Sequence, residues 1–304
     1  MDSTWTHGVV VGVDGSSDSR RALQWALGVA ARHDAEVTAV CAYETPYAPS
    51  APPVTGGNDD ARAESRDAAL RVLQQVAGVE EMRPDVELRL EPGSPAHVLV
   101  QHSRTADLVV VGHSGVSGFE RFVLGSVSAA TGAMARGPVA VVPPRARTGA
   151  PARVVVGVDP DGDPGAVLDL AFSEARAAGC MVQLVHVIAA RTQDEAVAET
   201  RHYARLRREL AYDQMGDLLE RWSEKYTDVD RAVAVRRGRP AEVLLDAVTP
   251  ADVLVVGSRR HPVPAGRALG SVPDALIRTA PCPVVVVHPR TPLPRTDRVT
   301  EEEP

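Results

Sequence analysis

Val11-Gly12-Val13-Asp14 is repeated 145 residues later as Val156-Gly157-Val158-Asp159. Four other short stretches recur with the same shift: Pro95-Ala96 with Pro240-Ala241, Ala106-Asp107 with Ala251-Asp252, Gly125-Ser126-Val127 with Gly270-Ser271-Val272, and Pro138-Val139 with Pro283-Val284. A constant shift means that the spacing inside each half is also the same, which chance similarity between apolar strands does not produce. The 304-residue chain is therefore predicted to be a tandem duplication.

The repeat sets the expected domain boundaries. Domain 1 is predicted over residues 1–143 and domain 2 over residues 152–289. Prolines and a glycine within residues 144–151 predict a linker, and the proline-containing, polar stretch 290–304 predicts a disordered tail. Each domain is long enough to bury a hydrophobic core of its own.

Apolar runs of strand length alternate with helical segments in both halves. Strands are predicted at about 8–13, 36–43, 86–90, 108–111 and 139–142, and again at about 153–158, 181–188, 232–235, 253–256 and 284–287. Continuous apolar runs indicate strands buried on both faces, and the alternation with helices demands parallel pairing through right-handed crossovers. The predicted fold is α/β, with two tandem doubly wound domains, each a five-stranded parallel sheet in the order 3-2-1-4-5.

This strand order predicts where a ligand would bind. Doubly wound sheets bind ligands at the carboxyl ends of the strands, at the point where the strand order reverses. Here the reversal lies between strands 1 and 4, which end at Asp14 and Gly112.

A glycine-rich loop follows strand 4 of the first half, with the pattern G-x2-G-x9-G-S. It comprises Gly112, Gly115, Gly125 and Ser126, with Gly118 and Ser128 also within this segment. Glycines allow close approach of backbone amides to phosphate oxygens, and the start of a helix at Ser126 favours an anion. The loop therefore predicts nucleotide binding, against the alternative that its glycines only turn the chain.

The second half departs from this pattern. Gly257, Gly270 and Ser271 are kept, but Arg260 replaces the second glycine and Pro273 replaces Ser128. Arg260 would either reach a phosphate through its guanidinium group or fill the crevice. We expect weaker nucleotide binding here than in the first half.

At these residues the sequence resembles the universal stress protein family in its tandem form, over about residues 6–143 and 151–288. The motifs are the paired Val-Gly-Val-Asp stretches, the G-x2-G-x9-G-S loop and the Pro138-Val-Ala-Val-Val ending, which in the second half reads Pro281-Cys-Pro-Val-Val-Val-Val. The resemblance implies an ATP-binding stress-response protein that acts as a nucleotide-dependent regulatory or binding module, with little or slow hydrolysis. It also implies that the two halves pair through their last strands and that two chains can associate as a homodimer.

The resemblance further assigns roles to single residues. Adenine would be held by backbone near Ala42, and near Val187 in the second half. In the first half Gly12 and Asp14 belong to the strand 1 motif, and Asp14 would lie near the ribose or a metal such as Mg²⁺; Gly112, Gly115, Gly125 and Ser126 would hold phosphates. Asp159 is the counterpart of Asp14. An alternative for Asp14 is a structural turn after strand 1, although its repetition as Asp159 favours the ligand role.

Two rival functions stay open on the sequence. Asp14-Gly-Ser-Ser-Asp18-Ser19 is close to SGGxDS, the phosphate loop of ATP pyrophosphatases, which would make the protein an AMP-forming enzyme; the second half has Asp159-Pro-Asp-Gly-Asp-Pro there instead. The other rival is a structural dimerisation protein with an empty loop. No catalytic set of carboxylates or of Ser, His and Asp stands out. His113 is expected to be a solvated loop residue.

Composition excludes several other classes. The net charge of −7 disfavours nucleic acid as a partner. The only lysine, Lys225, lies outside any GxxxxGK[ST] pattern, and the first βα turn lacks GxGxxG. Three scattered cysteines and dispersed histidines predict neither disulfides nor a metal centre. The sequence shows no apolar run of membrane-spanning length and no secretory signal, so a cytoplasmic protein is expected.

Overall fold

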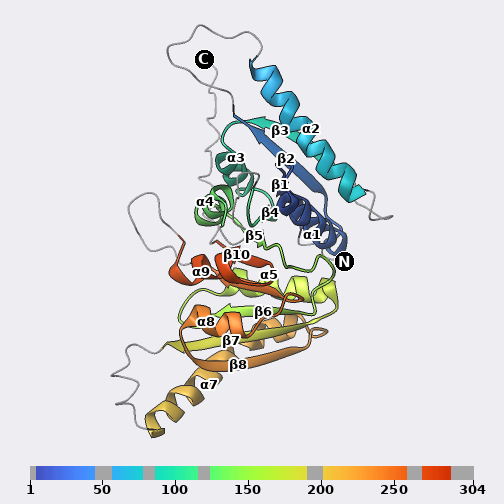
Figure 1. Ribbon diagram of the computed structural model, residues 1–304. Coiled ribbons are helices and arrows are strands. Elements are labelled where there is room, and N and C mark those ends of the chain that lie inside the picture. Colours follow the sequence, from blue (N-terminus) through green and yellow to red (C-terminus); the bar gives the residue numbers. More distant parts are fainter. Residues whose placement is uncertain are drawn as a thin grey trace, which may run out of the picture.

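The computed structural model describes residues 5–44, 57–77, 86–115, 124–189, 201–258 and 269–288. Figure 1 shows two α/β halves, one above the other, with their strands meeting in the middle. The elements of the first half are β1 (Val9–Gly12), α1 (Ser17–His33), β2 (Val37–Tyr43), α2 (Gly57–Ala77), β3 (Val86–Pro92), α3 (Pro95–His102), β4 (Leu108–Gly112), α4 (Ser126–Met134) and β5 (Val139–Val142). Those of the second are β6 (Arg153–Val158), α5 (Gly165–Ala178), β7 (Met181–Ala189), α7 (Arg201–Lys225), β8 (Arg231–Gly238), α8 (Pro240–Asp246), β9 (Val253–Gly257), α9 (Ser271–Thr279) and β10 (Val284–Val287).

The strand order within each half is confirmed. The described strands form one ten-stranded sheet in the order β3-β2-β1-β4-β5-β10-β9-β6-β7-β8, so both halves have the order 3-2-1-4-5. Every neighbouring pair within a half is parallel, whereas β5 and β10 pair antiparallel at the centre. The last strands of the two halves therefore join them into a continuous sheet.

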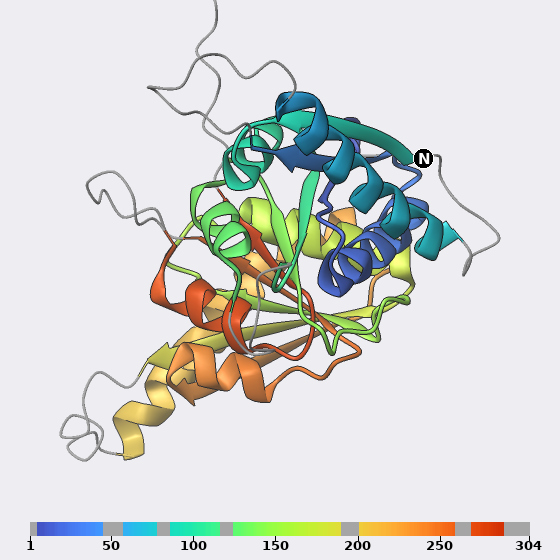
Figure 2. The ribbon, with the colours of Figure 1, turned by 45° about the horizontal axis from the view of Figure 1, so that its top comes forward.

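Helices cover both faces of this sheet. Alternate strand residues point to opposite faces, so Val9 and Val11 belong to the core beneath α1, α2, α5 and α7, while Val10 belongs to the core beneath α3, α4, α8 and α9. Figures 1 and 2 show α3, α4, α9 and α8 following one another along a single side of the molecule. Each core thus runs across the boundary between the halves.

A buried polar cluster also joins the halves, on the α1 and α5 side. The carboxylate of Glu174 lies 2.5 Å from Arg32 Nη2 and 2.8 Å from His33 Nε2, although Glu174 is only 4% exposed. The indole of Trp5 stacks on the His33 ring with centroids 4.2 Å apart. The position equivalent to Glu174 in the first half is Val29, so this cluster has no symmetric counterpart.

The connection between the halves is packed against both of them. Ala146 is 2% exposed, and its carbonyl oxygen accepts a hydrogen bond from Arg21 of α1. The backbone amide of Arg147 donates to the carbonyl oxygen of Pro250, 3.1 Å away in the second half. The stretch predicted as a linker is therefore a fixed connection. The predicted tail, 290–304, lies outside the described residues.

Helices long and apolar enough to cross a bilayer do not occur within the described ranges.

Candidate nucleotide site

The turn after β1 is ordered by the side chain of Asp14. Its Oδ1 accepts a hydrogen bond from the backbone amide of Ser16 at 3.0 Å, which closes an Asx turn. Ser16 in turn caps α1, since its hydroxyl oxygen accepts the amide proton of Ser19. The other oxygen, Oδ2, lies against Gly115: a Cβ atom added to Gly115 would be 2.8 Å from it. The turn thus brings the exposed Asp14 carboxylate to the glycine loop.

The end of β4 approaches the start of α1 so closely that only glycine fits. A Cβ atom on Gly112 would lie 2.7 Å from the backbone carbonyl carbon of Asp18. The Asp18 carboxylate accepts a hydrogen bond from the amide of Ser114 at 3.0 Å, and the Ser128 hydroxyl donates to the Gly112 carbonyl oxygen at 2.5 Å. The glycine loop is therefore held from α1 on one side and from α4 on the other.

The start of α4 completes the crevice. Gly125 is its N-cap residue and offers no side chain to cap the first amides, which begin at the exposed Ser126. The amide of Gly125 donates to the His113 carbonyl oxygen at 2.8 Å, and a Cβ atom on Gly125 would lie 3.4 Å from the amide nitrogen of Gly115. Asp14, Gly115 and Gly125 thus converge at one helix start, where backbone amides favour an anion.

The other predicted residues lie at varying distances from this centre. Ala42 is half-buried near the end of β2, opposite Glu91 of β3. Gly12 faces α3, where a Cβ atom would lie 3.0 Å from Leu99 Cδ1, so its missing side chain makes room for a helix. Ser128 is buried, with its hydroxyl bonded to Gly112. Gly118 lies outside the described residues.

Cys41 is a residue near the crevice that the sequence did not single out. It is 2% exposed in β2, and its thiol donates to the carbonyl oxygen of Ser65 at 3.3 Å. Burial, and to a lesser extent the negative charge of Asp14, raise the pKa of Cys41 to about 11. The thiol therefore stays protonated at neutral pH and is a packing group next to Asp14.

His113 differs from the sequence prediction. It was expected to be solvated, but it is 3% exposed, and its Nε2 lies 3.3 Å from the carbonyl oxygen of Arg278 in α9. The prediction was wrong because a single half gives no sign that the other half covers this residue.

The second crevice keeps the framework of the first but not its helix start. Asp159 closes the same turn, with its Oδ1 accepting the amide of Asp161 at 3.3 Å. Gly270 again caps α9 without a side chain and Ser271 is exposed, but Pro273 in the first turn has no N–H to offer an anion. Val187 is half-buried in β7.

Gly257 and Arg260 are the remaining predicted residues of the second loop. Among the described residues, a Cβ atom on Gly257 would meet only the side chain of Val167, at 3.2 Å, in place of the backbone that Gly112 meets. Arg260 lies outside the described residues.

The donor set of the first crevice suits a divalent cation that is shared with a ligand. Asp14 and Asp18 supply carboxylate oxygens, the ligands that Mg²⁺ prefers, and Mg²⁺ is commonly held by one or two carboxylates together with substrate phosphates. Within the described residues, no three or more His, Cys, Asp or Glu side chains gather into a metal cluster. These residues therefore fit a cation that arrives with a nucleotide.

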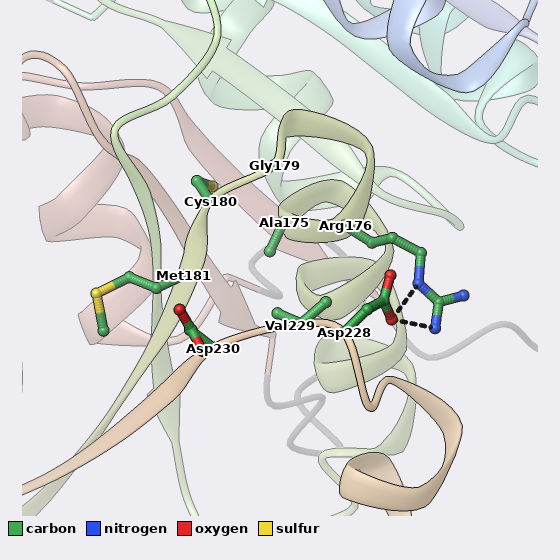
Figure 3. Close-up of a pocket in the computed structure, with 8 residues that line it drawn as sticks. All are labelled: Ala175, Arg176, Gly179, Cys180, Met181, Asp228, Val229 and Asp230. Atoms are coloured by element: carbon green, nitrogen blue, oxygen red, sulfur yellow. Dashed lines mark hydrogen bonds and ion pairs between the residues drawn. The ribbon is translucent and has the colours of Figure 1, made fainter.

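A shallow cavity of about 160 Å³ lies elsewhere, lined by Ala175, Arg176, Gly179, Cys180, Met181, Asp228, Val229 and Asp230 (Figure 3). It is at the amino ends of β7 and β8, opposite the crevice. Arg176 there is already paired with Asp228, Nη2 to Oδ1 at 3.0 Å, and with the carbonyl oxygen of Lys225. Because ligands of doubly wound sheets bind at the carboxyl ends, the crevice and not this cavity is the candidate site.

The fold defines a tandem α/β protein with two doubly wound halves. The sequence model of the universal stress protein family matches residues 6–143 and 152–288. A universal stress protein of Mycolicibacterium smegmatis is 30% identical, with 95% of this chain and all of that one aligned, and one of Mycobacterium tuberculosis is 32% identical over 93% and 97%. The crystal structure of a universal stress protein from Archaeoglobus fulgidus shares the fold, with a TM-score of 0.65 at 19% identity over 93% of this chain and 98% of that one. The chain belongs to the universal stress protein family.

Proposed function

We propose that this protein binds ATP, together with Mg²⁺, in the crevice of its first half and acts as a nucleotide-dependent regulatory module in the cytoplasm, with little or slow hydrolysis. The observation that carries the proposal is the convergence of Asp14, Gly115 and Gly125 at the uncapped start of α4. Gly112, Ser126 and the backbone near Ala42 would complete the site. Binding would change the surface that the paired halves present to a partner, and two chains would associate as a homodimer.

Electrostatics supports a role for the cation. Asp14 and Asp18 both carry negative charge at the mouth of the crevice, so a bare triphosphate would be repelled. Asp14 and Asp18 would hold Mg²⁺, and its charge would offset this repulsion. We therefore expect chelation of Mg²⁺ by EDTA to weaken nucleotide binding.

Gly125→Val tests the site. Gly125 has φ −63° and ψ 149°, which valine adopts readily, and the added Cβ atom makes only ordinary contacts, so the fold should be kept. The side chain would cover the Gly115 amide. We expect the dissociation constant for a fluorescent ATP analogue to rise at least about tenfold, roughly the loss of one to two charge-assisted hydrogen bonds.

Gly270→Val is the matched variant in the second half, since Gly270 has nearly the same backbone conformation, φ −62° and ψ 157°. We expect it to reduce binding much less. If Gly125→Val and the unaltered chain bind the analogue with equal affinity, the proposed site is wrong. If Gly270→Val loses more affinity than Gly125→Val, the second half is the tighter nucleotide site.

Product analysis separates this proposal from its rivals. Incubation with ATP should leave AMP and pyrophosphate at background levels, whereas an AMP-forming enzyme would release both. Nucleotide released by heating the purified protein distinguishes a binding protein from a structural protein with an empty loop.

A further inference from the structure

The imidazole of His113 connects the glycine loop of the first half to a helix of the second half. Its Nε2 lies 3.3 Å from the carbonyl oxygen of Arg278, near the end of α9, and its Nδ1 lies 3.2 Å from the hydroxyl oxygen of Ser114. A carbonyl oxygen only accepts, so Nε2 carries the proton. With the proton on Nε2, Nδ1 accepts from the Ser114 hydroxyl. Both nitrogens are thus engaged, one on each side of the boundary.

His113 is also tied to the residues that form the candidate site. Its carbonyl oxygen accepts the amide of Gly125 at 2.8 Å, and the amide of the next residue, Ser114, is held by Asp18 at 3.0 Å. Gly115 follows directly. The position of the Gly115 amide therefore depends on a segment that is hydrogen-bonded to α9 through the His113 ring.

At the equivalent position of the second half, the described contact stays within that half. The equivalent of His113 is Ser258, and its hydroxyl lies 2.8 Å from Nδ1 of His288, within its own half. Moreover, α9 begins at Gly270 and Ser271, the second candidate site, and ends beside His113. One helix therefore has the second crevice at its start and the anchor of the first loop at its end.

We propose that His113 is a positioning residue that makes nucleotide affinity in the first crevice depend on α9 of the second half. This rests on the proposed function for the identity of the ligand. It goes beyond that function because the first site then needs both halves. The second half would position the glycine loop of the first through α9.

The test compares four full-length variants in titrations with a fluorescent ATP analogue. His113→Leu fills the buried space without a donor, and His113→Asn has an amide too short to reach Arg278. For both we expect affinity to fall about fivefold, the usual worth of one hydrogen bond. His113→Gln places an amide N–H at the reach of Nε2 and should stay within about twofold of the unaltered chain, while Ser258→Ala should not change affinity.

Hydrogen exchange of the peptide that contains residues 113–115 supplies a readout independent of the ligand. His113→Leu should speed exchange there but not in β1, because only the loop loses its anchor. If the unaltered chain binds nucleotide and both His113→Leu and His113→Asn bind equally well, the inference is overturned. If the unaltered chain binds no nucleotide, the proposed function fails, and unchanged exchange in the His113 variants would then overturn the anchoring as well. If His113→Leu does not fold, the contrast between Asn and Gln decides.

Discussion

The crevices of the two halves have the same first strand and turn but differ in the glycine loop and in the first turn of the helix that follows it. In both halves the glycine of the first strand leaves space for a leucine of the short helix that precedes the fourth strand: Gly12 faces Leu99 of α3, and Gly157 faces Leu244 of α8 at 2.9 Å. The Asx turn that follows is also common to both. The strand 1 glycine and the Asx turn are kept even in the half whose loop has changed, so folding alone accounts for these two features.

This comparison changes the argument about Asp14. Its repetition as Asp159 favoured a ligand role on the sequence, but both residues make the same turn, and the turn explains the repetition. Evidence for the ligand role now comes from what the first half has alone: Oδ2 of Asp14 beside Gly115, and a helix start where Ser128 stands in place of Pro273.

The largest expected effect concerns the asymmetric contact between the halves. Glu174→Ala would leave the buried Arg32 guanidinium without its carboxylate, and we expect the free energy of unfolding to fall by about 3–5 kcal/mol, as for other broken buried pairs. Urea unfolding measures the loss. Glu174→Gln keeps a hydrogen-bonding group for His33 and should cost less; an alanine variant as stable as the parent would show that the cluster does not join the halves.

A smaller loss of stability is expected from substitutions of Gly112 and Gly257, the glycines that end β4 and β9. Gly112→Ala would place a methyl group against the backbone of Asp18, which cannot move without shifting α1, so we expect a loss of about 2–3 kcal/mol. Gly257→Ala meets only the Val167 side chain, which can adjust, and should cost about 1 kcal/mol or less. Thermal unfolding of the two variants measures both losses in stability. Equal losses would contradict the conclusion that Gly112 packs on backbone and Gly257 on a side chain.

The smallest effect is a difference in thiol reactivity. Burial raises the pKa of Cys41 to about 11 and that of Cys282 to about 12, so both remain protonated thiols until the pH approaches those values. Cys180 is half-exposed, although burial and Glu174 raise its pKa as well. With a disulfide reagent at pH 8 we expect Cys180 to react first and the other two only after unfolding. Cys180→Ser is the control, and rapid labelling that persists in it would show that a buried thiol is accessible.

The fold followed from the sequence because its signals are local. The shift of 145 residues and the alternation of apolar runs with helices are visible without knowing how the halves meet, and strands β6 and β10 begin and end where predicted. The candidate residues of the first crevice were predicted in the same way, because strand ends and glycine spacing are properties of one half.

What the sequence did not predict depends on contacts across the boundary. His113 and Glu174 each bond to residues more than a hundred positions away, and neither contact has a counterpart in the other half that a repeat comparison would reveal. The close approach of Gly112 to Asp18 is equally a matter of how α1 packs on β4. Such contacts arise from tertiary packing and leave no pattern along the chain.

The antiparallel pairing of β5 with β10 has a further consequence. In a symmetric homodimer joined through the same strand pair, any substitution would occur on both sides of the interface and in both crevices at once. Within a single chain each half changes by itself. His113 contacts the end of a helix while its counterpart Ser258 does not need to. The first crevice keeps Gly115 while the second has Arg260, so the two halves of one chain can diverge.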